Sequence, residues 1–273
     1  MKTRKRIPLT IIIGAVLAAL LIAAVALAPR LAPNNPLRVN MALSLSKPSE
    51  QYPLGTDQLG RCVLSRLLYG GRTSLGVTCL VLLITLLIGT VIGTISGLFA
   101  GRWPDKLLTA LSEVVLAFPG LVLALVISGL LGPGILKVML AIALVSWAKY
   151  ARLVRSLVIG IRRADYMRAA RVAGSSTFRL VIRHILPNIG GTLGTIVVTD
   201  FGSTILRFAG LSFIGLGAQP PEPEWGMMIN DARLYMETNP MLIIYPILAV
   251  TLSVLAFHLL GDGLRDRLDS KAL

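Results

Sequence analysis

Six runs of about twenty mainly apolar residues constrain the fold of this chain more than any other feature. An α-helix needs about 20 such residues to cross the hydrocarbon core of a bilayer. Segments that cross must be helices or closed barrels, because lipid offers no partner for an unpaired peptide group. We therefore predict an all-α polytopic membrane protein with about six transmembrane helices. The predicted spans lie at 7–28, 75–99, 106–131, 135–161, 189–213 and 241–260.

The composition agrees with a membrane protein and argues against other classes. Of the 273 residues, 55% are hydrophobic and 15% are charged. An ordinary soluble domain has about 45–50% apolar and about 25% charged residues. The formal net charge is +14, but a nucleic-acid-binding protein of that charge would be less apolar. We therefore expect the chain to lie in a lipid bilayer and to bind no nucleic acid.

The first apolar run has two interpretations. Four basic residues lie within residues 2–6, and Ala26-Leu27-Ala28 resembles a signal-peptidase site. A cleaved secretory signal is therefore one interpretation. The run is longer than the about 7–15 residues of a signal core, which favours a retained anchor helix.

Basic residues divide unevenly between the two sides of the predicted bundle. With the amino terminus placed inside, the cytoplasmic segments hold 18 Lys and Arg residues and the outer segments hold 8. This bias follows the positive-inside rule, so we predict that both termini are cytoplasmic. The chain then divides into an anchor helix with an outer loop (1–74) and a core of five helices (75–273), with a cytoplasmic loop at 162–188.

The cytoplasmic loop carries small residues at helical spacing. On a helix, Tyr166, Ala169, Ala170 and Ala173 share one face through their i, i+3, i+4 and i+7 positions. A face of small residues allows another protein surface to approach the backbone closely. A basic amphipathic helix lying on anionic lipid head groups is the alternative.

Two further residues are expected to end the helices of this loop. Gly174 suits the left-handed conformation that often follows the last residue of a helix. Pro187 follows Leu186 and is expected to stop a second helix just before the fifth span.

The loop resembles the signature loop of ABC importer permeases. Its matching residues are Ala169-Ala170, Gly174 after three intervening residues, and Leu186-Pro187. Arg168 stands where the family carries a Glu. The resemblance implies that the short helix docks into a cytoplasmic ATPase subunit and transmits its closure to the membrane helices.

Other blocks extend the resemblance to the peptide/nickel branch of this family. It implies a type I ABC importer permease fold in the bacterial inner membrane. It also implies a homologous second permease, two ATPase subunits or domains, and an extracytoplasmic solute-binding protein. Asp57, Arg61, Glu224 and Trp225 are candidates to dock that binding protein. The matching blocks are LGTDQLGR at 54–61, LSFIGLG at 211–217, PEWG at 223–226 and GDGLRD at 261–266.

The cargo is predicted to be nickel or a metal-chelate complex, with a di- or oligopeptide as the alternative. Peptide permeases of the branch often carry a Glu where this chain has Phe208, and the run at 227–233 resembles nickel-import permeases more closely. No pair of His or Cys residues has the spacing of metal ligands, so no metal site is assigned to the chain. Met227 and Met228 are candidates to present thioethers along the path, and ordinary packing is the alternative.

Charged residues inside the spans are further candidates to line the translocation path, because charges in the bilayer are costly. Glu113 lies in the third span, and Asp200 and Arg207 lie in the fifth. Asp200 and Arg207 share a helix face but are about 10.5 Å apart along its axis, too far to pair directly. Contact with the second permease and buried hydrogen bonding between helices are the alternatives.

The sequence contains no Gly-x-x-x-x-Gly-Lys-Ser/Thr phosphate loop. ATP and Mg²⁺ are therefore assigned to the partner ATPases, no cofactor is expected on this chain, and the chain itself is not predicted to be an enzyme. An ion-coupled secondary transporter and an intramembrane enzyme are the alternatives from other classes. No inverted repeat or set of paired catalytic groups supports either of them.

Overall fold

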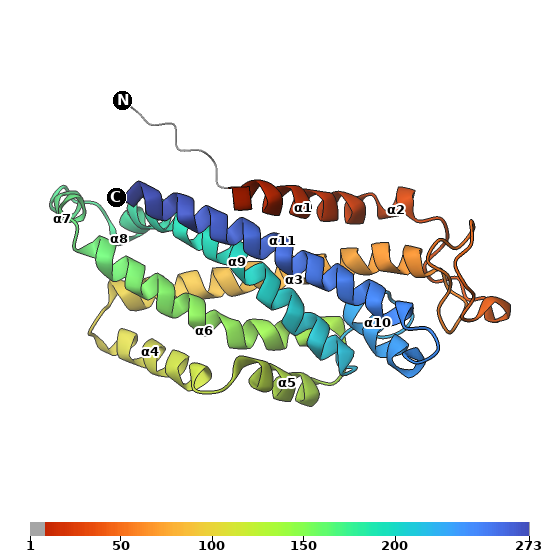
Figure 1. Cartoon of the computed structure of the whole chain (residues 1–273). Coiled ribbons are helices and arrows are strands. Elements are labelled where there is room, and N and C mark those ends of the chain that lie inside the picture. Colours follow the sequence, from red (N-terminus) through yellow and green to blue (C-terminus); the bar gives the residue numbers. More distant parts are fainter. Residues whose placement is uncertain (1–8, 273) are drawn as a thin grey trace, which may run out of the picture.

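The computed structural model describes residues 9–272, with side chains described to residue 267, and shows a bundle of long helices (Figure 1). The described residues form helices and no strand, which confirms the all-α prediction. The principal helices are α1 (Leu9–Ala26), α2 (Ala28–Leu31), α3 (Val63–Leu98), α4 (Trp103–Leu116), α5 (Gly120–Leu131), α6 (Ile135–Arg162), α7 (Asp165–Val172), α8 (Thr177–Leu180), α9 (Leu186–Phe213), α10 (Trp225–Ala232) and α11 (Met241–Ala272).

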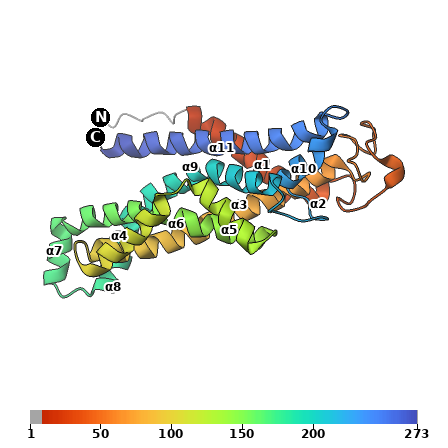
Figure 2. The ribbon, with the colours of Figure 1, turned by 90° about the horizontal axis from the view of Figure 1, so that it is seen from below.

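The long helices share one general direction, and their connections gather at two opposite ends (Figures 1 and 2). One end holds α7 and α8 and is called here the α7 end. The other holds α2, the loop that precedes α3, and α10, and is called the α10 end. α1 runs antiparallel to α11, with Gly14 against the backbone of Leu260.

Within residues 9–272, four helical segments are long and apolar enough to cross a membrane. They are α1, α3, the continuous segment Thr177–Phe213, and α11 as far as Arg267. α4 and α5 make a fifth candidate if they count as one bent span. α6 has 28 residues, but every stretch of 18 residues in it holds more than two charges. The chain is therefore a multi-pass membrane protein.

The bounds of these segments differ from those of the predicted spans. The segment Thr177–Phe213 begins before the predicted start at residue 189, and α11 continues past the predicted end at residue 260. The first span was predicted at 7–28; residues 7 and 8, with the basic cluster before them, lie outside the described residues. α3 begins at Val63 rather than at residue 75, so the boundary drawn at residue 74 falls inside this helix. The helical turns at 63–74 contain polar residues, so hydropathy alone placed the start of this span at residue 75, too late in the sequence.

The third predicted span is two helices rather than one. α4 ends at Leu116, α5 begins at Gly120, and their axes differ by 88°. Pro119 lies at the N-cap of α5. Proline has no N–H to donate and disfavours the helical conformation of the residue before it, here Phe118, so the chain turns at this point.

α3 and α6 approach each other through a row of glycines. Gly89, Gly93 and Gly97 recur every four residues on one face of α3. A Cβ atom at Gly93 would lie 2.5 Å from the carbonyl oxygen of Ala151, and one at Gly89 would lie 2.4 Å from Cβ of Tyr150. Small residues at this spacing let the backbones of two membrane helices pack directly.

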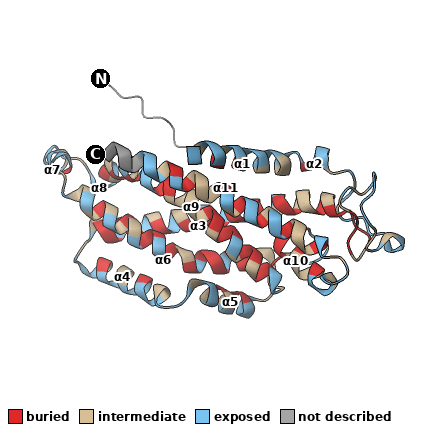
Figure 3. Ribbon diagram, viewed as in Figure 1, coloured by how far each residue is buried: buried red, intermediate tan, exposed pale blue. Residues whose placement is uncertain are grey.

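Buried residues concentrate on α3, α6 and α9, whereas α1, α4 and α5 are largely exposed (Figure 3). The exposed side chains of these three outer helices are mostly apolar, and Leu130 is 84% exposed. In a membrane such a surface faces lipid or another subunit, because exposure of a large apolar patch to water is unfavourable.

We expect Gly93→Ala to lower the stability of the bundle by about 1–3 kcal/mol, the usual cost of overpacking. The added methyl group would meet a backbone oxygen of α6, which a rotamer change cannot move. Gly76→Ala in the same helix is the control, because nothing lies within 4 Å of the position of its Cβ. Thermal unfolding in detergent compares the two variants, and equal midpoints would contradict the close packing of α3 and α6.

Candidate translocation path and coupling loop

An ion pair joins α6 to α9 near the middle of the bundle. Nζ of Lys149 lies 2.7 Å from Oδ1 and 2.9 Å from Oδ2 of Asp200. The Asp200 side chain is 15% exposed and the Lys149 side chain 55%. Asp200 was predicted to line the path, whereas Lys149 was not singled out for this role.

Two cavities meet at this ion pair. The first, of about 230 Å³, extends toward the α10 end between α3, the α4–α5 break, α6 and α9. The second, of about 770 Å³, extends toward the α7 end between α6, α9 and α11. We call them the α10-side cavity and the α7-side cavity. Lys149, Tyr150 and Asp200 line both, so the ion pair lies at their boundary.

Arg207 lies in the α10-side cavity, two helical turns along α9 from Asp200. Its Nη1 atom donates a hydrogen bond to Oγ of Ser146 at 3.3 Å. Arg207 and Asp200 thus have different partners on α6. Phe118 and Gly120 line the same cavity, so the bend between α4 and α5 helps to shape it.

Glu113 lies apart from this group. It is exposed on α4 and borders a third cavity, of about 210 Å³, together with Arg152 and Arg155. Arg155 forms a two-pronged ion pair with Asp105, from Nε at 2.6 Å and Nη2 at 2.9 Å. The structure therefore brings Asp200 and Arg207 to one cavity and Glu113 to another.

α7 is anchored to the bundle by Met167. This side chain is fully buried and packs in one cluster with Val158 of α6, Leu180 of α8 and Ile189 of α9. Met167 is not among the residues predicted from the sequence, although its place between polar neighbours could have identified it as a lone apolar anchor. With one face anchored, the rest of this short helix projects from the bundle.

The predicted coupling residues of α7 are largely exposed. Ala170 is half-buried beside the Met167 cluster. Val172, 91% exposed, and Phe178, 77% exposed, add large apolar side chains at the same end. A surface with exposed apolar side chains is a candidate for contact with another protein. The exposed members of the predicted set are Tyr166, Arg168, Ala169, Ala173 and Gly174.

The end of α7 has the conformation expected of Gly174. This residue has a φ of 79°. Its N–H donates to the carbonyl oxygen of Arg171, and the N–H of Ser175 donates to that of Ala170, both at 3.0 Å. These two bonds form a Schellman motif, in which glycine avoids the strain of the left-handed conformation.

The structure corrects the role expected of Pro187. The helix does not stop there, because helical structure continues from Thr177 to Phe213. Pro187 lies in the first turn of α9, directly after Leu186, where a missing N–H is tolerated. The five preceding residues, Val181–Ile185, form a wider π-helical turn, which shifts the hydrogen-bond register ahead of the proline.

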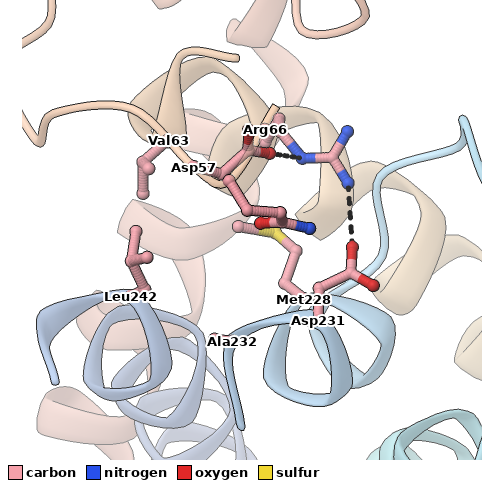
Figure 4. A pocket seen from close by; sticks show the side chains of 8 residues that line it. Asp57, Val63, Arg66, Met228, Asp231, Ala232 and Leu242 are labelled. Atoms are coloured by element: carbon pink, nitrogen blue, oxygen red, sulfur yellow. Dashed lines mark ion pairs between the residues drawn. The ribbon is translucent and has the colours of Figure 1, made fainter. Parts of the chain in front are cut away.

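Two arginines and two aspartates form an ionic cluster at the α10 end, and Figure 4 shows three of its members, Asp57, Arg66 and Asp231. Oδ2 of Asp57 lies 2.6 Å from Nε of Arg61 and 3.4 Å from Nε of Arg66. Oδ2 of Asp231 lies 3.6 Å from Nη2 of Arg61 and 4.0 Å from Nη2 of Arg66. Burial raises the pKa of the Asp231 carboxyl, and the two arginines act against this increase. The cluster joins the loop before α3 to α10.

Glu224 caps the first turn of α10. Its carboxylate accepts hydrogen bonds from the N–H groups of Gly226 (2.8 Å) and Met227 (2.9 Å) and from Oγ of Ser74 (2.9 Å). The side chain is fully buried, and this burial raises the pKa of the carboxyl. Capping satisfies backbone donors that otherwise have no partner at the start of a helix.

The four residues predicted to dock a binding protein are all buried. In this conformation they hold the α10 end together and do not present side chains on its surface. Met228 packs in a core cluster with Trp225 and Phe201, as the packing alternative requires, while Met227 is half-buried. Among the described side chains, no group of three or more His, Cys, Asp or Glu residues is placed to hold a metal ion.

Comparison with known proteins identifies relatives over most of the chain. Residues 89–273 match the family described as binding-protein-dependent transport system inner membrane component. The chain is 41% identical over 237 residues to the nickel transport system permease protein NikC of Escherichia coli (strain K12), covering 87% of this chain and 85% of the relative. It is 47% identical over 227 residues to the glutathione transport system permease protein GsiD of Shigella flexneri serotype 5b, covering 82% of this chain and 74% of the relative.

We expect Glu224→Ala to destabilise the α10 end by about 1–2 kcal/mol, as loss of a helix cap does. The N–H groups of Gly226 and Met227 would then be left without partners. Hydrogen exchange of the α10 amides measures this effect. Glu222→Ala, at an exposed position two residues earlier, is the control and should leave exchange unchanged. Equal exchange in both variants would show that the cap is dispensable.

Proposed function

The chain belongs to the family of binding-protein-dependent transport system inner membrane components, and we propose that it forms part of the path by which nickel or a metal-chelate complex is imported. It is a permease subunit of an ABC importer, and its relatives are permease subunits, not enzymes. A di- or oligopeptide is the second candidate cargo. The relative named as a glutathione permease favours it, and the relative named as a nickel permease favours the first.

The two cavities that meet between α6 and α9 are the main support for the proposed path. They meet at Lys149 of α6 and Asp200 of α9. α9 belongs to a segment long and apolar enough to cross a membrane, and α6 beside it has 28 residues. Charged groups at this depth are unfavourable unless they are paired or serve transport. Cargo moving between the two cavities would pass this pair. A second permease would supply the opposite wall.

The α7 end is the proposed docking site for the ATPase subunits and therefore the cytoplasmic end. Met167 ties α7 to α6, α8 and α9, so a force on α7 would reach helices that line the path. Arg168, which replaces the family's usual Glu, would give this contact a different charge. The lipid-surface alternative would instead place α7 flat on the membrane, and the next experiment separates the two.

We expect Ala173→Cys to crosslink to a partner ATPase in the assembled importer, because this residue is exposed at the C-cap of α7. Leu234→Cys, 80% exposed at the α10 end, is the matched control and should give no such product. Crosslinking in inner-membrane vesicles, with mass-spectrometric identification of the partner, measures both. Absence of the Ala173 product would leave α7 without its proposed role.

The α10 end is then extracytoplasmic and is proposed to meet the solute-binding protein. The ionic cluster and the Glu224 cap stabilise this end from within. Docking would therefore use exposed neighbours of the four predicted residues. Leu234 and Met236, 80% and 57% exposed, are the large apolar side chains available after α10.

We expect Asp200→Asn to reduce uptake at least tenfold while the permease still assembles with its partners. The amide would leave Lys149 without its ionic partner at the boundary of the cavities. Uptake of radioactive nickel, with and without a chelator, and of a labelled dipeptide also separates the two candidate cargoes. Asp262→Asn, exposed on α11, is the control. Equal loss of uptake and of co-purification would give Asp200 a structural role instead.

A further inference from the structure

We propose that Lys149 and Arg207 form a carboxylate-binding site in the α10-side cavity, at which a carboxylate of the cargo displaces Asp200 from Lys149. The inference rests on the proposed function, because it assigns cargo contacts within the same path. It applies to both candidate cargoes, since peptides and many metal chelators carry carboxylates. It does not apply to a bare divalent cation.

The charges around the cavities support this assignment. The described lining of the α10-side cavity holds two cations, Lys149 and Arg207, and one anion, Asp200. In the α7-side cavity, Arg152 adds a further cation beside Lys149 and Asp200. Coulomb interactions strengthen where water is scarce, so a cationic excess attracts carboxylates and repels free Ni²⁺.

The two cations line the same cavity. Arg207 donates to Ser146, which is three residues before Lys149 on α6. Residues at this spacing are neighbours on one face of a helix, so Arg207 contacts the same face of α6 that carries Lys149. Arg207 donates one hydrogen bond, from Nη1 to Ser146. A guanidinium has five N–H donors in a geometry that matches a carboxylate, so Arg207 can also bind a ligand.

The ion pair is arranged so that it can exchange partners. More than half of the Lys149 side chain is exposed to the cavities, so a ligand can approach it without unfolding α6. Replacing the Asp200 carboxylate by a cargo carboxylate conserves the charge of the pair, which limits the unfavourable energy of opening it. Tyr150 lines both cavities together with this pair, and its buried hydroxyl has no hydrogen-bond partner among the described residues.

Paired probes that differ in one carboxylate test the site in the complete importer. Nickel-63 is supplied with histidine or with histamine, which lacks the carboxylate, and labelled dialanine is compared with its C-terminal amide. The variants are Lys149→Gln, Arg207→Gln and the charge-conserving Arg207→Lys. Lys137→Gln is the control, an exposed lysine near the start of α6. ATP hydrolysis and subunit co-purification show whether each complex is intact.

We expect the unmodified importer to prefer the carboxylate-bearing member of the pair it transports by at least tenfold. Lys149→Gln and Arg207→Gln should each reduce uptake of that member at least tenfold, while Arg207→Lys retains part of it and Lys137→Gln retains all. Equal uptake of both members, or full uptake by the two glutamine variants, would overturn the site and leave the permease assignment standing. No ATP-dependent uptake of any probe would instead overturn the proposed function.

Discussion

The direct contact between the backbones of α3 and α6 is the constraint on which the rest of the bundle depends. Gly89 and Gly93 remove the side chains that would otherwise separate these helices. α6 is thereby held at a defined depth and rotation, with Lys149 turned toward α9 and Arg155 toward Asp105. The polar positions of the bundle thus follow from a packing contact made by residues that carry no polar group.

Ion pairing between helices explains how several charges are accommodated within the bundle. Asp200 and Asp105 each meet a basic residue of α6, and each pair joins segments about fifty residues apart in the sequence. These two pairs differ in setting. Asp105 also accepts hydrogen bonds from Thr109 and from the N–H of Gly101, so it is fixed from several sides. Lys149 borders two cavities and its side chain is more than half exposed, which suits the proposed exchange of partners.

The sequence predicts elements whose cause is local and misses features whose cause is tertiary. Apolar runs identify the helices, and Gly174 ends α7 because its left-handed conformation depends on neighbouring residues alone. The partnership of Lys149 and Asp200 depends on how α6 and α9 pack, which helical periodicity does not encode. The burial of Glu224 also depends on tertiary packing. Its position beside a proline suggested an exposed loop, so the sequence did not predict that it is buried.

The unbroken helix that runs from Leu186 to the ion pair has a mechanical consequence. From Leu186 to Asp200 the chain rises about 21 Å as one rod, at 1.5 Å per residue. A straight helix that tilts moves as one body. A small tilt of α9 at Leu186 would therefore produce a larger sideways displacement of the Asp200 carboxylate. The π-helical turn at Val181–Ile185 lies at that base, and such turns often occur at functional sites in helices. Such leverage would separate Asp200 from Lys149 without any change in the helix that carries it.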